Sequence, residues 1–124
     1  MAPDDFLLAC ESGDIDKVVS LIDKVDPSVF YNWPIELACR HGRLEVVKVL
    51  LADPRVNPAD NFCIEVASRN GYVDIVRLLL EDPRVEISIS DIDWAKQNGH
   101  TEIVDLLTEH LYRLDGPEYS KNII

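Results

Sequence analysis

The sequence predicts an all-α solenoid of four helix-turn-helix units, and three observations predict it. A helix-like stretch with its exit turn occurs twice, as LEVVKVLLADPRVN at residues 44–57 and as VDIVRLLLEDPRVE at residues 73–86. Four glycines recur at intervals of 29, 29 and 28 residues, namely Gly13, Gly42, Gly71 and Gly99. The same apolar residues return in register around each glycine, so the chain repeats one supersecondary unit.

Each unit is predicted to contain two short helices. The first occupies about eight residues before the glycine, with an alanine four positions ahead of it and large apolar residues seven and five ahead. The glycine ends this helix because it lacks a Cβ and adopts left-handed dihedrals readily. The second helix carries a valine and a leucine, five and eight positions after the glycine. Asp53-Pro54 and Asp82-Pro83 end it, because a residue before proline is pushed out of helical space.

A helix pair of this size cannot bury its apolar face alone, so we expect neighbouring units to stack over one continuous core. The units are predicted to span about residues 4–32, 33–61, 62–90 and 91–114. Together they form a single domain over residues 1–114. Residues 115–124 carry no repeat signal, and we expect a tail that is either disordered or folded back through Ile123 and Ile124.

The two outer units depart from the repeat in ways that suit the ends of a stack. In the first unit, Lys17 stands where the other units have an apolar residue. In the last unit, Lys96 and Thr108 stand at positions that are smaller or more apolar elsewhere. A finite stack needs such polar outer faces. In the first unit, Asp26-Pro27 also comes two residues later than its counterparts, so we expect a different exit from its second helix.

The motifs GRLEVVKVLL, GYVDIVRLLL and GHTEIVDLL resemble the second helix of ankyrin repeats, written G-H-x-E-V-V-x-L-L-L. The resemblance covers about residues 4–112 and implies an ankyrin-type solenoid. Units of 28 or 29 residues are shorter than the usual 33, which implies shortened finger loops, without strand pairing. The family's T-P-L-H start is nearly absent, and only Pro34 keeps the proline. Short units with D-P-R-V exits are similar to ankyrin arrays of amoebae and large viruses.

Composition narrows the classes of function. The chain is 47% apolar and 28% charged, as in soluble globular proteins, and its formal net charge of −11 disfavours binding to a nucleic-acid backbone. No apolar run reaches the roughly 18 residues of a membrane span. The start MAPDDFLLAC lacks the basic residues of a signal peptide. The three cysteines are odd in number and lack metal-ligand spacing, so we expect reduced thiols in the cytoplasm or nucleus.

No catalytic constellation is present in the sequence, and we expect neither an enzyme, nor a bound metal, nor a cofactor. His100 occupies the family's G-H position, which implies a structural role. Cys10 and Cys39 stand three positions before successive glycines and are expected to be small core residues. The many carboxylates are expected to be solvated.

The resemblance also implies a binding surface, because this family often binds partners through the end of each first helix and the finger. These positions hold Glu11, Ser12, Arg40, His41, Arg69, Asn70, Gln97 and Asn98 at the helix ends, and Asn32 and Asn61 in the fingers, flanked by Trp33 and Phe62. Arginine and aromatic residues are enriched at binding hot spots. In the alternative interpretation, the arginines only pair with nearby carboxylates and the two aromatic residues are buried.

We therefore expect a protein–protein interaction module that presents a rigid concave surface to another protein. The partner's identity does not follow from the sequence. We expect a monomer that binds neither nucleic acid nor membrane. A self-assembling structural repeat protein is the first alternative, and an enzyme with an unrecognised site is the second.

Overall fold

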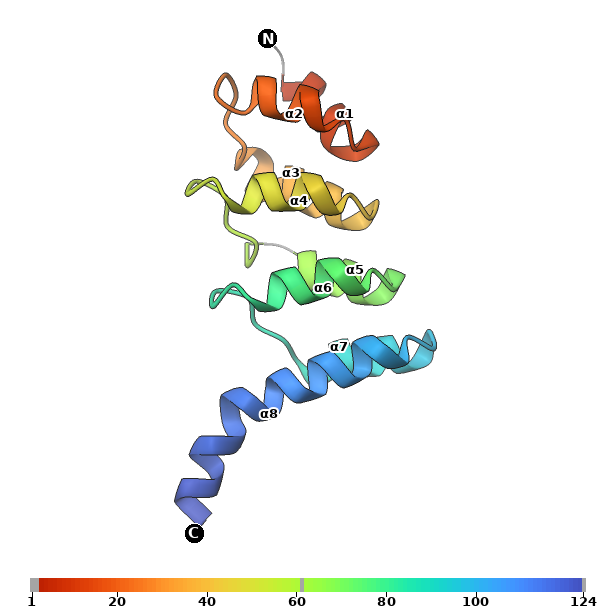
Figure 1. The fold of residues 1–124 in the computed structure, drawn as a ribbon, viewed down its shortest axis with the longest axis vertical. Helices are drawn as coiled ribbons and strands as arrows, with labels where there is room; N and C mark the ends of the chain where they lie inside the picture. Colours follow the sequence, from red (N-terminus) through yellow and green to blue (C-terminus); the bar gives the residue numbers. More distant parts are fainter. Residues whose placement is uncertain (1–2, 61, 124) are drawn as a thin grey trace.

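The computed structural model describes residues 3–60 and 62–123. Within them, the chain forms eight helices and no strand (Figure 1). The helices are α1 (Pro3–Ser12), α2 (Ile15–Leu21), α3 (Val29–Arg40), α4 (Leu44–Leu51), α5 (Cys63–Asn70), α6 (Val73–Leu80), α7 (Ile89–Gln97) and α8 (Thr101–Ile123). Successive helices pair, α1 with α2 and so on to α7 with α8, which confirms the all-α repeat fold.

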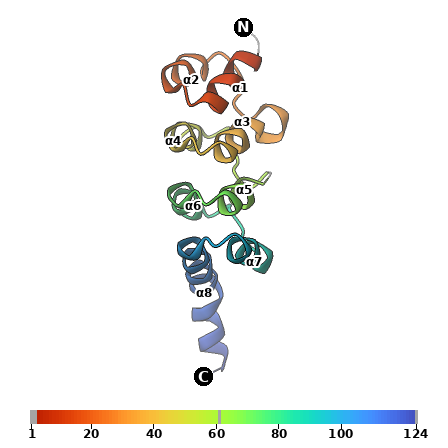
Figure 2. The ribbon, with the colours of Figure 1, turned by 90° about the vertical axis from the view of Figure 1, so that its right-hand side faces the viewer.

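The pairs stack into two columns, as Figure 2 shows. Helices α1, α3, α5 and α7 pack on one another in the first column, and α2, α4, α6 and α8 follow one another in the second. We call the outer side of the first column the first-helix face. The core lies between the columns, and the leucine eight positions after each glycine is buried in every unit. These leucines are Leu21, Leu50, Leu79 and Leu107.

The repeat glycines are required both for their backbone dihedrals and for space. Gly71 has φ +82°, a left-handed conformation, and the next residue, Tyr72, donates its backbone N–H to the Ala67 carbonyl at 3.0 Å. A Cβ on Gly71 would lie 2.7 Å from Cε1 of the His100 ring, which belongs to the following unit. The residue after each glycine packs in this way on the glycine of the preceding unit: Arg43 on Gly13, Tyr72 on Gly42 and His100 on Gly71.

Two of these side chains also bind a carbonyl of the preceding unit. Nε of Arg43 donates to the Glu11 carbonyl at 2.8 Å, and Nε2 of His100 lies 3.0 Å from the Arg69 carbonyl. Both carbonyls belong to the last turn of a first helix, where carbonyl groups have no helical N–H from which to accept a hydrogen bond. His100 therefore has the structural position that its place in the repeat implies.

The D-P-R-V exit turns form a second set of contacts between units. The Asp53 carboxylate holds the Arg55 guanidinium at 2.8 Å, and Arg55 donates to the carbonyl of Ile22 at 3.0 Å. Asp82 holds Arg84 in the same way at 2.7 Å, and Arg84 donates to the Val56 carbonyl at 3.0 Å. The motif thus ends one helix and also binds the exit of the previous unit, a role that its turn chemistry alone does not predict.

The start of α3 contains three consecutive left-handed residues, Phe30, Tyr31 and Asn32, with φ of 54°, 55° and 61°. Left-handed dihedrals cost roughly 1–2 kcal/mol per non-glycine residue. The buried Asn32 side chain offsets part of this cost. Its Oδ1 accepts the Asn57 N–H at 2.9 Å, and its Nδ2 donates to Asp60 at 3.0 Å. Asn32 therefore fixes the exit loop of the second unit from inside the protein, although the resemblance placed it on the binding surface.

The ends of the stack show the polar substitutions that the sequence predicts. Lys17 is exposed in α2, whereas its counterparts Val46, Ile75 and Ile103 are buried. At the other end, α8 passes residue 114 and stays helical to Ile123, and its second half extends beyond the stack (Figure 1). Ile124 lies outside the described residues.

Candidate partner-binding surface

The residues predicted to bind a partner occupy the C-terminal ends of the first helices, and many contact the neighbouring unit. Nε2 of His41 lies 3.4 Å from the Glu11 carboxylate, and Asn70 donates to the carbonyl of Arg40 at 3.5 Å. Ser12 and Asn98 bind carbonyls within their own units, at 3.4 and 2.7 Å. Gln97 is exposed at the end of α7, and Asn61 lies outside the described residues.

Arg40 pairs with a carboxylate and an aromatic ring of the second unit. Its Nη2 lies 2.8 Å from the Glu36 carboxylate, and its guanidinium carbon lies 5.6 Å from the centre of the Trp33 ring. Glu36 is 4% exposed, and its second oxygen accepts the backbone N–H of Phe62 at 3.1 Å. Arg40 thus pairs with a buried carboxylate, as the alternative interpretation expects, and whether it also binds a partner stays a prediction.

Arg69 has a different environment, although it holds the equivalent position one unit later. Its guanidinium carbon lies 4.5 Å from the centre of the Trp94 ring. Among the described side chains it forms no ion pair with a carboxylate. A guanidinium stacked on an aromatic face keeps its N–H edge free for hydrogen bonds. Arg69 is thus an arginine that is oriented by the protein and still open to an acceptor.

The two aromatic residues predicted at the fingers differ in exposure. Trp33 is partly buried beneath Arg40, whereas Phe62 is 58% exposed at the start of α5. Trp94, which is 44% exposed, was not among the predicted residues. Its position five residues before the glycine belongs to the core in the inner units, as buried Leu37 and Val66 show. A tryptophan at that position in an end unit was the sequence feature that could have indicated an exposed binding residue.

A hollow of about 240 Å³ lies between the second and third units. Arg40, Phe62, Glu65, Val66 and Arg69 line it. Desolvation raises the pKa of Glu65, and Asp91 raises it further, while Arg69 lowers it. The hollow therefore combines an exposed ring, an open guanidinium edge and a half-buried carboxylate.

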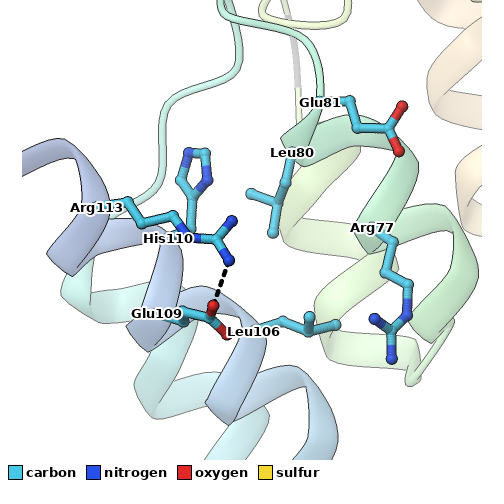
Figure 3. A pocket seen from close by; sticks show the side chains of 7 residues that line it. All are labelled: Arg77, Leu80, Glu81, Leu106, Glu109, His110 and Arg113. Atoms are coloured by element: carbon cyan, nitrogen blue, oxygen red, sulfur yellow. Dashed lines mark hydrogen bonds and ion pairs between the residues drawn. The ribbon is translucent and has the colours of Figure 1, made fainter.

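A second hollow, of about 320 Å³, lies between α6 and α8 on the other column (Figure 3). Its two arginines form ion pairs, Arg113 with Glu109 and Arg77 with Glu102. In the described part of the chain no group of three or more metal-binding side chains comes together. Likewise, no described helix has the length and apolar content needed to cross a membrane.

The fold and this surface define a class, the helical repeat proteins that stack short units into a solenoid. A family model for ankyrin repeats, in three copies, matches residues 6–91. The chain therefore belongs to the ankyrin-repeat family, whose repeats generally mediate protein–protein interaction and are typically not enzymes. The match ends within α7, and the helix pair α7–α8 continues the same packing. No curated protein matched the chain in a sequence comparison.

Proposed function

We propose that the chain is a protein-binding module whose partner docks on the first-helix face of the second to fourth units, the concave surface that the family implies. The observation that carries this proposal is the position of Arg69, stacked on the exposed Trp94 and lining the same hollow as the exposed Phe62. Arginine and large aromatic residues dominate binding energy at interfaces. A stack whose units are fixed to one another presents these side chains with little entropy left to lose.

The remaining features support a protein partner and a reducing compartment. The net charge of −11 favours a protein partner over nucleic acid. Cys10, Cys39 and Cys63 are buried and form no disulfide among the described residues, which agrees with a reducing compartment such as the cytoplasm or nucleus. Burial raises the pKa of the Cys10 thiol to about 12, so this thiol is a core group with little thiolate.

The proposal is tested by affinity purification from the source cell with the wild-type chain and two variants. We expect Arg69→Glu to lose the captured protein, because it reverses the charge of the open guanidinium. Arg77→Glu, on the other column, is the matched control and should keep it. Arg40 is unsuitable for this test, since Arg40→Glu would place a second carboxylate beside buried Glu36.

If both variants capture the same protein equally well, the binding surface does not lie on the first-helix face. Light scattering addresses the self-assembly alternative directly. A mass near 14.0 kDa is expected for the monomer. A concentration-dependent mass at twice that value or above would favour a structural repeat protein.

A further inference from the structure

The second and third units carry the same pair of charged residues in two different states. Glu36 and Arg40 stand four residues apart in α3, and Glu65 and Arg69 stand four apart in α5. Glu36 and Arg40 form an ion pair at 2.8 Å. Glu65 and Arg69 do not, because the Arg69 guanidinium lies on the Trp94 ring instead. The carboxylate and the guanidinium are therefore paired in the second unit and remain unpaired with each other in the third.

Glu65 also lacks the backbone donor that Glu36 has. Glu36 accepts the N–H of Phe62, which lies 26 positions later. Phe62 stands nine positions before Gly71, and its counterpart nine positions before Gly99 is Ser90. No described hydrogen bond reaches the Glu65 side chain. Desolvation already raises the pKa of this partly buried carboxylate, so an N–H that donates to it would stabilise its charged form.

We propose that the hollow between the second and third units binds a main-chain amide of an extended peptide segment from the partner. The amide N–H donates to Glu65, the amide carbonyl accepts from Arg69, and the neighbouring apolar side chain packs on Phe62 and Val66. This inference rests on the proposed function, because it places the partner on the same face.

Charge complementarity selects this occupant. A free acceptor beside a free donor matches a neutral group that carries one donor and one acceptor, as an amide does. A partner carboxylate would satisfy Arg69 and leave Glu65 without a donor. It would also be repelled by Glu65, whose own pKa is already raised by desolvation and by the negative charges of Asp91 and Glu36. The peptide is therefore expected to be neutral where it enters the hollow.

The test begins with a phage-displayed library of random linear dodecapeptides selected on the full chain. Enriched peptides are expected to contain apolar residues and to lack Asp and Glu in their binding core. A synthetic copy is then methylated at one backbone nitrogen after another. We expect one N-methyl position to weaken binding to the wild type about tenfold or more, the scale of a hydrogen bond to a charged group. The same methylation should make little difference to binding by Glu65→Met.

Arg69→Met keeps the side-chain length and removes the guanidinium, so it should weaken binding of the unmethylated peptide about tenfold. Arg77→Met and Glu102→Met remove a charged pair from the other column and should leave affinity unchanged. Glu65→Met should fold, since it removes a carboxylate without a donor. If it does not, Glu65→Leu replaces it, and the methylation series on the wild type stands by itself.

The outcomes separate the inference from the proposed function. Failure to enrich any peptide overturns the inference. Some peptides could require Phe62 and Arg69 for binding and yet lose the same affinity on methylation in the wild type and in Glu65→Met. That result would overturn the amide contact and would still support binding on the first-helix face. Peptides that are insensitive to Phe62→Ser, Glu65→Met and Arg69→Met bind elsewhere, and they overturn both.

Discussion

At the scale of single residues, the third unit contains a fully buried hydroxyl that the fold does not satisfy. Ser68 is fully buried, and its hydroxyl has no hydrogen-bond partner among the described residues. Cys10 and Cys39 occupy the same position, three residues before the glycine, in the first two units. A thiol loses less than a hydroxyl when it is buried without a partner, because it forms weaker hydrogen bonds with water.

Ser68→Ala is therefore expected to stabilise the protein by about 1 kcal/mol, since a buried hydroxyl without a partner is unfavourable by about that amount or more. The free energy of unfolding from denaturant melts measures the effect. Ser20→Ala serves as the control, because Ser20 is exposed and should change stability by less than about 0.5 kcal/mol. A clear loss of stability in Ser68→Ala would show that the hydroxyl has a partner in solution.

A second residue-scale prediction concerns the phase of helix α4. Leu50 is fully buried, whereas the Lys48 side chain is 52% exposed and pairs with Glu45 at 3.1 Å. Leu50→Ala should lower the free energy of unfolding by about 2–5 kcal/mol through lost burial and cavity formation. Lys48→Ala should change it by less than about 0.5 kcal/mol. Equal losses in matched urea melts would contradict the burial pattern.

At the scale of elements, the exit turns connect units through paired charges. Side-chain and backbone hydrogen bonds from Arg55 lower the pKa of Asp53, and the Arg84 side chain is the main cause of the lowered pKa of Asp82. A carboxyl whose pKa is lower in the folded state contributes stability above its unfolded pKa, and this contribution disappears as the pH falls through the folded pKa. The exit turns should therefore weaken in acid.

Asp82→Asn is expected to remove part of the acid dependence. Stability at neutral pH should fall modestly, by less than about 1 kcal/mol, because the Arg84 side chain is 43% exposed and water screens the pair. Below the usual pKa range of aspartate the variant and the wild type should converge, since the wild-type carboxylate becomes protonated there. Thermal melts between neutral and acidic pH measure this difference. A gap that stays constant into acid would mean that the Asp82 charge is unimportant.

At the scale of the whole molecule, 23 acidic residues outnumber 12 basic ones, and the stack carries a formal charge of −11. Raising the salt concentration from about 10 mM to about 150 mM shortens the screening length from about 30 Å to about 8 Å. Repulsion between units should then weaken, and the melting temperature should rise. A fall in the melting temperature would mean that the exposed ion pairs outweigh the repulsion.

The sequence predicted the architecture well because the architecture depends on features that each unit repeats. The glycine frame and the leucine positions follow from a helical period, and they need no knowledge of the neighbouring unit. The binding surface is harder to predict, because it depends on contacts across units. Arg40 and Arg69 have equivalent positions, yet one pairs with Glu36 and the other stacks on Trp94. Asn32 is buried by a left-handed turn that begins at Phe30 and Tyr31, and large aromatic residues rarely adopt such dihedrals.

The packing of Arg43, Tyr72 and His100 on the glycines of preceding units has a consequence for how such a chain can grow and change. Each joint consists of a bare backbone on one side and a flat group on the other, and three chemically different groups fill the second role. A duplicated or transplanted unit therefore meets a partner that accepts it without matched mutations. The glycine itself must be kept, because a side chain there would clash with the next unit. Each joint therefore strictly constrains the unit that carries the glycine and leaves the packing residue of the next unit free to vary.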